Sequence, residues 1–532
     1  MLNIVKRTRT MGSFSETKLG LDPGVIEACR EAATQVASRV VGEIAGNTTV
    51  SVERTVARLL GVDGVDELDV PMPNALVDHV REARGLERGI AYWLGNAMLA
   101  LNQPAAEIAR RVSAGELDVC ALPLEDDEAI QARVTAECTA AVEEIRARRE
   151  QRLRFREGLA ESPSPLRYML TGTGDVYEDV VHGRAVAEAG GDVVALVRST
   201  AQSLLDFVPY GATREGHGGT YNTQENFRIV REAMDEWSAE HGRYVRVSSF
   251  CSGLCMPEIA AMGALEGLDN TVNDALYGIL YRDLNMVRTL VDQRFSRRIN
   301  GYFGIVINTG EDNYLRTADA VAAAPSVVAS QLINYFLALE SGVPAEQIAV
   351  GNSFEIDPQV ENGFLYELAH AQLTRELFPD CPIKYMPPTR HMNGNPLRTQ
   401  ASDTLFSLVA VATGQAIQTV GVATEGIFTP HIHDRVIGIE TAGYVHTTAR
   451  DLGDEIEYKP GGIVRTRAAQ VLREAEALLT EMAEIGVIAA IAQGVFGDVS
   501  RQVDEGRGAD GIIAIGDDYL NPFVELMELQ HA

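Results

Sequence analysis

Short apolar runs alternate with longer amphipathic stretches from about residue 166 onward. Such short runs are typical of strands buried on both faces, and apolar residues that recur every three or four positions indicate helices. The clearest predicted strands are residues 193–197, 244–250, 301–308, 347–354, 382–386 and 417–422. Repeated strand–helix units predict a parallel α/β fold, in which the loops after the strands carry the chemistry.

The extent of this alternation favours a closed barrel over an open sheet. The units extend over about 280 residues, close to the roughly 250 of a typical (β/α)8 TIM barrel. An open doubly wound sheet is the alternative, but it should begin with a glycine-rich turn, and no G-x-G-x-x-G follows a predicted strand. We therefore predict a TIM barrel at residues 161–450.

The flanks of the predicted barrel are helical. Residues 1–160 form an N-terminal accessory region, in which Asn74 is placed to cap a helix that runs to Gly85. The charged stretch 143–157 is typical of a solvated helix or a linker. Residues 451–532 return to helix and are predicted to cap the barrel or to form a subunit interface. Whether residues 1–10 belong to the native fold stays open.

Composition and charge exclude several classes of protein. Hydrophobic residues make up 46% of the chain and charged residues 23%, as in ordinary globular proteins. The formal net charge of −29 argues against nucleic-acid binding, which needs clustered cations. We find no apolar run long enough for a membrane span and no signal peptide. Six scattered cysteines indicate a reduced, cytoplasmic protein.

Polar residues follow the predicted strands, where a barrel gathers its functional groups. Arg198 and hydroxyls such as Ser203 offer the donors that a phosphate needs, although a capping or solvated role explains them equally well. Tyr277 is able to stack on an aromatic ring. Asp312 and Lys384 suit the two ends of an amino acid, or a structural ion pair. The other candidates are Ser252, Arg282 and Glu425, the last without an assigned partner.

Two motifs resemble metal sites. Cys251-x3-Cys255 matches the start of a radical-SAM cluster motif, but Glu258 stands at the third position, so we interpret the thiols as buried and inert. His431-x-His433 resembles the metal pair of barrel hydrolases, which lies on the first strand there and near the end of the chain here. Capping or surface histidines are the favoured interpretation, and a metal-dependent barrel hydrolase remains an alternative.

Long stretches of the chain resemble the α (large) subunit of the D-lysine 5,6-aminomutase family. They are TVSVERTVARLLGVDG, PYGATREGHGGTYNTQENFRI, CSGLCMPEIAAMGALE, NDALYGILYRDLNM, INTGEDNYL, KYMPPTRHMNGN and NPFVELM. The similarity extends from about Thr49 to the end of the sequence. It implies an isomerase that moves the terminal amino group of D-lysine or L-β-lysine from C6 to C5 by a radical mechanism. The implied cofactors are pyridoxal 5′-phosphate (PLP) and adenosylcobalamin.

The resemblance also implies a division between subunits. This chain supplies the barrel that holds PLP, and a smaller β subunit supplies the cobalamin domain and the Schiff-base lysine for PLP. The expected assembly is α2β2. The sequence agrees with that division, because it contains no D-x-H-x-x-G cobalamin motif and only four lysines: Lys6, Lys18, Lys384 and Lys459.

The resemblance assigns cofactor contacts to four residues of this sequence and an active-site position to a fifth. Arg198, Ser203 and Ser252 match positions that bind PLP, chiefly its phosphate. Tyr277 matches the tyrosine that stacks on the pyridine ring, and Arg282 matches a further active-site arginine whose role is not assigned.

Asp312 and Lys384 match residues that hold the ammonium and the carboxylate of the substrate. Their charges suit those groups. An ornithine 4,5-aminomutase is the nearest alternative, although its large subunit carries the cobalamin domain on the same chain. A non-catalytic assembly subunit is a further alternative. The sequence does not distinguish D-lysine from L-β-lysine, nor the symmetry of the assembly.

Overall fold

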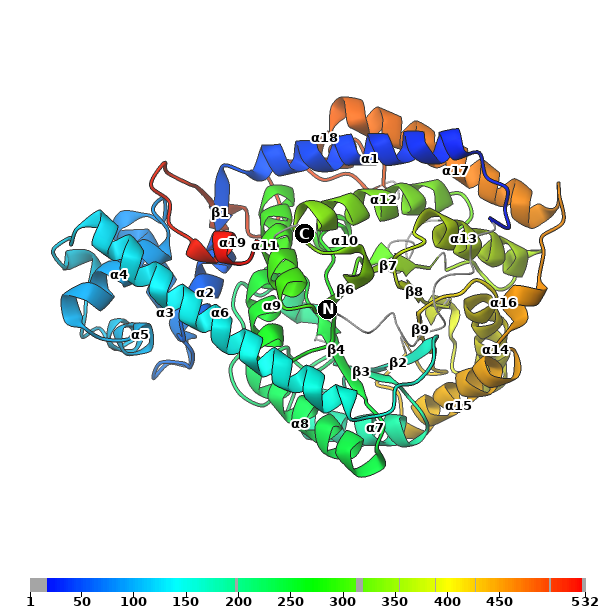
Figure 1. Ribbon diagram of the computed structural model, residues 1–532, viewed down its shortest axis with the longest axis horizontal. Helices are drawn as coiled ribbons and strands as arrows, with labels where there is room; N and C mark the ends of the chain where they lie inside the picture. The colour runs from blue at the N-terminus through cyan, green and yellow to red at the C-terminus, as the bar shows by residue number, and fades with distance from the viewer. Residues whose placement is uncertain are drawn as a thin grey trace.

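Eight parallel strands, β2 to β9, close into a barrel in the order in which they occur along the chain (Figure 1). The structure is a computed structural model, and it describes residues 17–196, 200–311, 319–353, 355–387, 389–425, 427–496 and 499–528. The barrel strands are β2 (Leu166–Thr171), β3 (Val193–Leu196), β4 (Arg246–Phe250), β5 (Asn270–Val272), β6 (Val306–Asn308), β7 (Ile348–Asn352), β8 (Ile383–Tyr385) and β9 (Ile417–Thr419). The predicted (β/α)8 barrel is confirmed.

The predicted strands differ from the observed ones in a few places. The pattern predicts one strand over residues 301–308, but helix α11 continues to Tyr302 and only Val306–Asn308 is extended. Strands β2 and β5 have no counterpart among the clearest predicted runs. Strand β5 has three residues, all buried, too few to make a periodic signal.

Side chains alternate along each strand between the barrel interior and the surrounding helices, as the period of two requires. The interior cluster consists of Tyr168, Val193, Ala195, Val306, Ala349 and Ile417. Their sequence neighbours, such as Met169 and Val194, belong to the core formed with the helices. This alternation decides which residues point into the barrel.

Helices surround the barrel on its outer side (Figure 1). They are α7 (Val176–Glu188), α8 (Gln224–His241), α9 (Met256–Leu265), α10 (Leu276–Arg282), α11 (Met286–Tyr302), α12 (Ala324–Glu340), α13 (Gly363–Leu377), α14 (Pro396–Ala412), α15 (Ile432–Thr448) and α16 (Leu452–Glu455). None of the helices in the described ranges combines the length and apolar character that crossing a membrane requires.

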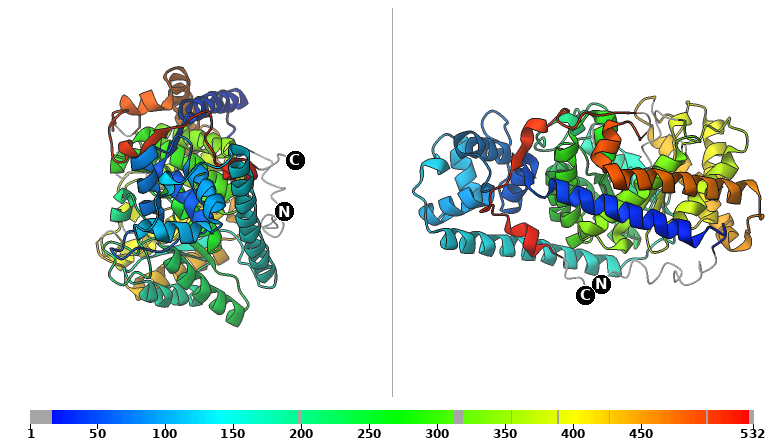
Figure 2. Two further views of the ribbon diagram at one scale, coloured as in Figure 1. Left: turned by 90° about the vertical axis from the view of Figure 1, so that its left-hand side faces the viewer. Right: turned by 90° about the horizontal axis from the view of Figure 1, so that it is seen from above.

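The two flanks of the barrel meet each other. The N-terminal flank comprises α1 (Pro23–Ile44), β1 (Asn47–Thr49), α2 (Val50–Leu59), α3 (Met72–Arg84), α4 (Ile90–Leu101), α5 (Ala105–Ser113) and α6 (Asp127–Glu157). The C-terminal flank comprises α17 (Ile463–Ile485), α18 (Val487–Ala492), β10 (Ile512–Ala514) and α19 (Pro522–Leu526). Strands β1 and β10 pair antiparallel, and α1 lies beside α17 (Figure 2). The boundaries at residues 160 and 450 stay predictions.

A buried ion-pair cluster fastens α2 to the barrel helix α9. The carboxylate of Glu258 accepts from Arg54 Nε at 2.8 Å and from Arg58 Nε at 2.8 Å, and Glu258 is fully buried. Burial raises the pKa of Glu258, but the two guanidinium groups outweigh burial and lower it. The accessory helices are therefore attached to the barrel by charge as well as by apolar packing.

Replacing Glu258 with glutamine should lower the free energy of unfolding by about 3 kcal/mol, because two buried guanidinium groups lose the carboxylate that they share. Urea unfolding of the purified chain measures this change. Glu144→Gln is the control, since Glu144 pairs with Arg148 on the surface. It should stay within about 0.5 kcal/mol of the wild type. Equal effects of the two substitutions would contradict the structural role of Glu258.

Candidate functional site

The residues that follow the carboxyl ends of β2–β9 form one rim, which we call the mouth. Backbone hydrogen bonds between neighbouring strands continue beyond the strand ends. Cys251 N donates to Val272 O at 2.7 Å, and Asn273 N donates to Asn308 O at 2.8 Å. Thr309 N donates to Ala349 O at 3.2 Å. Loops that are far apart in the sequence thus begin side by side, where TIM barrels place their chemistry.

Ser203 and Ser252 lie on two neighbouring loops of the mouth. Ser203 belongs to the short 3-10 helix η2 (Thr200–Leu204) after β3, and Ser252 comes two residues after β4. Both residues are buried. Leu254 N donates to Ser203 O at 3.2 Å, and Gly253, at φ +97°, lets the loops touch, because a Cβ there would lie 2.6 Å from Ser203 Cα. The structure brings these two predicted residues together.

Tyr277 and Arg282 form a second pair, on the short helix α10 after β5. Arg282 Nη2 donates to the Tyr277 hydroxyl at 3.1 Å, and the guanidinium carbon lies 5.3 Å from the centre of the tyrosine ring. Tyr277 is half-buried in the first turn of the helix. Arg282 Nε is buried and finds no hydrogen-bond partner in the described ranges. The pair thus offers an aromatic face with a cation at its edge.

Lys384 lies inside the barrel, on β8. Its ammonium nitrogen is 4.8 Å from the ring centre of Tyr168, which belongs to the interior cluster, and the residue is buried. The Tyr168 hydroxyl lies 3.1 Å from Ser248 Oγ. A buried ammonium is costly unless polar or anionic groups surround it. Of the other predicted site residues, Arg198 and Asp312 lie outside the described residues.

The mouth also contains polar side chains that the sequence did not predict as site residues. Asn308 Nδ2, Ser353 Oγ and Thr419 Oγ1 are buried and have no hydrogen-bond partner among the residues that the structure describes. Asn308 and Thr419 are two residues beyond Val306 and Ile417 of the interior cluster, so they point into the barrel. Polar residues at the ends of apolar runs were the available signal. Unpaired buried polar groups favour a site that a polar ligand completes.

Glu425 follows β9, and the structure supplies the neighbour that the sequence did not. Burial raises the pKa of Asp403, on α14, and the Glu425 carboxylate raises it further. The two acidic groups thus influence each other at this side of the mouth. A proton on Asp403 relieves the repulsion between them.

The two motifs that resemble metal sites lie in the protein core and at the start of a helix. All six cysteines are buried and none forms a disulfide, as predicted for Cys251 and Cys255. Cys251 Sγ donates to Met256 O at 3.1 Å, and burial raises the pKa of the Cys255 thiol. His431 is the residue that precedes the first turn of α15, and His433 lies within that turn. The thiols of Cys251 and Cys255 therefore pack in the core, and the two histidines lie at the start of α15.

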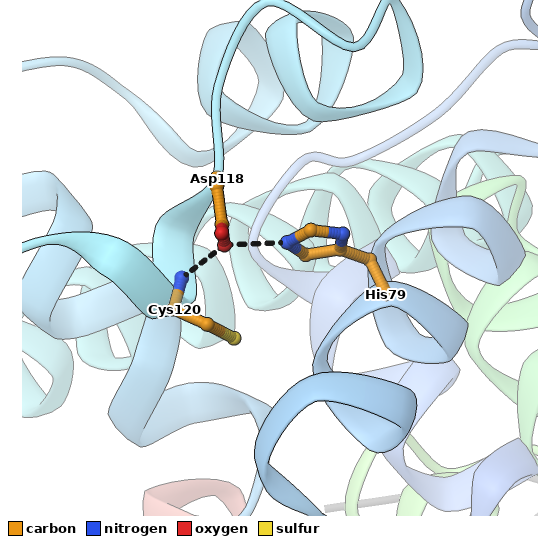
Figure 3. A group of neighbouring side chains, drawn as sticks. All are labelled: His79, Asp118 and Cys120. Atoms are coloured by element: carbon orange, nitrogen blue, oxygen red, sulfur yellow. Dashed lines mark hydrogen bonds and ion pairs between the residues drawn. The ribbon is translucent and has the colours of Figure 1, made fainter.

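In the described part of the chain, one group of His, Asp and Cys side chains is compact enough to hold a metal ion: His79, Asp118 and Cys120 (Figure 3). Asp118 accepts from Cys120 N at 2.9 Å, and its carboxylate lies 2.9 Å from His79 Nε2. Burial raises the pKa of the Cys120 thiol, which disfavours the thiolate that a metal would need. Asp118 caps a 3-10 turn in the N-terminal flank, away from the mouth.

A large cavity lies at the opposite end of the barrel. It measures about 1050 Å³ and is lined by the amino ends of strands, such as Leu166 and Val306, and by arginines of α6. Those arginines are engaged: Arg152 binds both oxygens of Asp235 at 2.9 and 2.6 Å. The predicted solvated stretch 143–157 thus attaches to the barrel. Size alone does not locate the chemistry, because barrel enzymes react at the carboxyl end.

A carboxyl group with a strongly raised pKa lies behind the mouth, on the outer side of the barrel. Glu367, on α13, is fully buried, and the Tyr385 hydroxyl donates to it at 3.4 Å. Burial raises its pKa to about 8. Tyr385 belongs to the core formed with the helices, so this carboxyl faces the barrel wall and not its interior. We interpret it as a structural proton site.

The comparisons with known proteins agree with one another. The family model described as the D-lysine 5,6-aminomutase TIM-barrel domain of the alpha subunit matches residues 19–526. The chain is 50% identical over 511 residues to the lysine 5,6-aminomutase alpha subunit of Fusobacterium nucleatum and 48% identical over 512 residues to that of Acetoanaerobium sticklandii. Each alignment covers 96% of this chain and 99% of the relative. A D-ornithine 4,5-aminomutase subunit beta from Acetoanaerobium sticklandii is 27% identical over 68% of this chain and 50% of its own length.

The raised pKa of Glu367 predicts how stability depends on pH. The folded chain keeps this proton up to about pH 8, whereas a free glutamate releases it near pH 4.5, so stability falls as the pH rises between these values. The free energy of unfolding of the wild type should fall by roughly 3–5 kcal/mol over this pH range, and Glu367→Gln should abolish that fall. Unfolding free energies at several pH values measure the slope. The exposed Glu361→Gln variant should keep the wild-type slope, and a Glu367→Gln slope equal to the wild type would refute the assignment.

Proposed function

This chain belongs to the D-lysine 5,6-aminomutase alpha-subunit family and is therefore an aminomutase subunit, and from that premise we propose the chemistry of its mouth. We propose that it forms the larger part of an enzyme that moves the terminal amino group of D-lysine or L-β-lysine from C6 to C5. Identity of 48–50% over 96% of the chain is the observation that supports this most strongly. The cofactors proposed are PLP and adenosylcobalamin, and the compartment proposed is the cytoplasm.

The mouth fits PLP by the chemistry of its donors. Ser203 and Ser252 offer hydroxyls on adjoining loops for the phosphate, and Arg198 would complete the set with a guanidinium. Tyr277 offers its ring as a stacking face, with Arg282 beside it. The unpaired Arg282 Nε and Asn308 Nδ2 support a polar occupant. When bound, PLP supplies an electron sink and adenosylcobalamin supplies the radical.

The chain's own residues bind and orient the substrate in this proposal. Lys384, buried beneath the mouth, holds the substrate carboxylate, and Asp312 holds the ammonium at the same end. The terminal amine then extends toward the Tyr277 and Arg282 side of the mouth. Burial of Lys384 excludes water, which strengthens the attraction between opposite charges and protects a reactive radical.

The lysines that the structure describes support a partner subunit. Lys384 is assigned to the substrate, Lys459 is exposed on the C-terminal flank, and Lys18 donates to Gly453 O near the amino end of the barrel. Neither of the latter two lies at the mouth. We propose that a smaller β subunit supplies the Schiff-base lysine for PLP and the cobalamin domain, in an α2β2 assembly. The name "alpha subunit" of the relatives supports a partner of this kind.

The direct test is to express this chain with the neighbouring subunit that carries a D-x-H-x-x-G motif and to add PLP and adenosylcobalamin. The proposal expects conversion of D-lysine or L-β-lysine to the 5-amino isomer, followed by nuclear magnetic resonance. Ornithine is the competing substrate, since a distant relative is an ornithine 4,5-aminomutase subunit. Turnover of ornithine alone, or a requirement for a metal ion in place of the two cofactors, would replace the proposal.

Lys384→Met should lower kcat/KM for the amino acid roughly 100-fold, because the substrate carboxylate loses a charged hydrogen-bond donor in a buried site. The PLP absorbance of the complex should persist, since Lys384 is not assigned to the cofactor. Steady-state kinetics and absorption spectra separate the two effects. Lys459→Met, an exposed lysine, is the matched control and should behave as wild type. Unchanged kinetics in Lys384→Met would remove this residue from the site.

A further inference from the structure

Asp206 lies three residues after Ser203 and is held by two arginines from different elements. Arg288, on α11, binds both of its oxygens, with Nη1 to Oδ2 at 2.8 Å and Nη2 to Oδ1 at 2.7 Å. Arg54, on α2, donates from Nη2 to Oδ1 at 2.5 Å. Burial raises the pKa of Asp206, but Arg288 and Arg54 outweigh burial and bring that pKa well below its ordinary value. The loop after β3 is thus anchored by a permanent charge.

Arg288 holds the loop after β4 as well. Its Nη2 donates to Leu254 O at 3.2 Å, and Leu254 comes two residues after Ser252. Leu254 N in turn donates to Ser203 O. One fully buried guanidinium therefore contacts both loops that carry the serines, and the loops contact each other.

The donors of Arg288 are all used. Its remaining bonds are Nη1 to Gly508 O at 3.2 Å and Nε to Asp292 Oδ2 at 3.4 Å. With the two bonds to Asp206 and one to Leu254, these account for the five N–H groups of an arginine. Arg288 thus has no donor left for a ligand, and any effect it has on the mouth acts through the position of the loops.

The N-terminal flank contributes to the same anchor. The sequence predicts that Asn74 caps its helix, but α3 begins at Met72 and the Asn74 amide donates to Asp206 O at 3.1 Å. Arg54 reaches Asp206 from α2 while its Nε binds Glu258. The loop that bears Ser203 is therefore positioned by accessory helices as well as by the barrel.

We propose that Asp206 and Arg288 are positioning residues that set the spacing of the Ser203 and Ser252 hydroxyls to fit a single phosphate group. The proposal rests on the proposed function, in which these serines hold the phosphate of PLP. Arg288 is buried and Asp206 is partly buried. An ion pair largely removed from water adds little net stability, because desolvation offsets much of the attraction. What it supplies here is a fixed geometry, and donors to an anion must be held within about 0.5 Å of their productive positions.

The test compares Asp206→Asn with Asp235→Asn in the complex with the partner subunit. Asp235 is a matched control, since it is also bound by two arginines, Arg152 through both oxygens and Arg231 at 2.7 Å, at the other end of the barrel. The complex is freed of cofactor, and the affinities for PLP and for pyridoxal, which lacks the phosphate, are measured by absorption titration.

We expect Asp206→Asn to weaken PLP binding at least tenfold and to leave pyridoxal binding unchanged, so that the preference for the phosphorylated form falls. Asp235→Asn should keep the wild-type preference at a comparable loss of thermal stability. A wild-type preference in Asp206→Asn, or an equal loss in both variants, overturns the proposal. If the wild-type complex binds no PLP, the proposed function fails instead.

Asp206→Glu provides a second variant in case Asp206→Asn does not fold. It keeps the charge and the pairing with arginine but displaces the loop by one methylene. The expected result is a lower PLP preference with thermal stability close to the wild type. Retention of the full PLP preference in Asp206→Glu counts against positioning as the role of this carboxylate.

Discussion

Closure of eight parallel strands is the constraint on which the mouth depends. Because all eight strands point the same way, their carboxyl ends share one rim, and residues 203, 252 and 277 lie on it in spite of their separation in the sequence, with Lys384 inside the barrel beneath it. The period of two then selects what faces inward. Lys384 enters the barrel because Ile383 and Tyr385 pack against the helices. Displacing β8 by one residue would exchange the lysine for a tyrosine.

Buried polar atoms without a hydrogen-bond partner in the described ranges occur at both ends of the barrel. At the amino end, Arg152 of α6 binds Asp235, but Arg231 Nε and Asn270 Oδ1, whose residues also line the large cavity there, have no such partner. At the mouth, Asn308 Nδ2 and Thr419 Oγ1 are buried without partners in the described ranges. Each unsatisfied group costs about 1–3 kcal/mol. A cost of that kind is understandable where a bound ligand removes it. Because such atoms occur at both ends, neither unpaired polar groups nor cavity volume alone locates the site.

The sequence predicted the barrel well, because strand runs are local patterns. Strand-end polar residues are local patterns too, and the roles assigned to them stay predictions. It could not reveal that Asn74 leaves its expected capping role for a carbonyl 132 residues away, nor that one arginine serves two loops. Such contacts depend on the three-dimensional packing of α2, α3 and α11. Strand β5 also had no periodic signal, since three buried residues look alike in a strand or a helix. Arg198 and Asp312, placed by resemblance, lie outside the described residues.

The proposed division of labour between the two subunits offers a reason why the loops of Ser203 and Ser252 are anchored by charge. If the lysine that holds PLP comes from another chain, the barrel holds the cofactor only by its phosphate and its ring, so the phosphate contacts carry a large part of its orientation. Loops that carry donors are mobile unless something rigid restrains them. Arg288, on a helix and with every donor used, is such a restraint, and Gly253 allows the two loops to lie in direct contact. A barrel without its own covalent link would have reason to use charge for geometry, even where that charge adds little to stability.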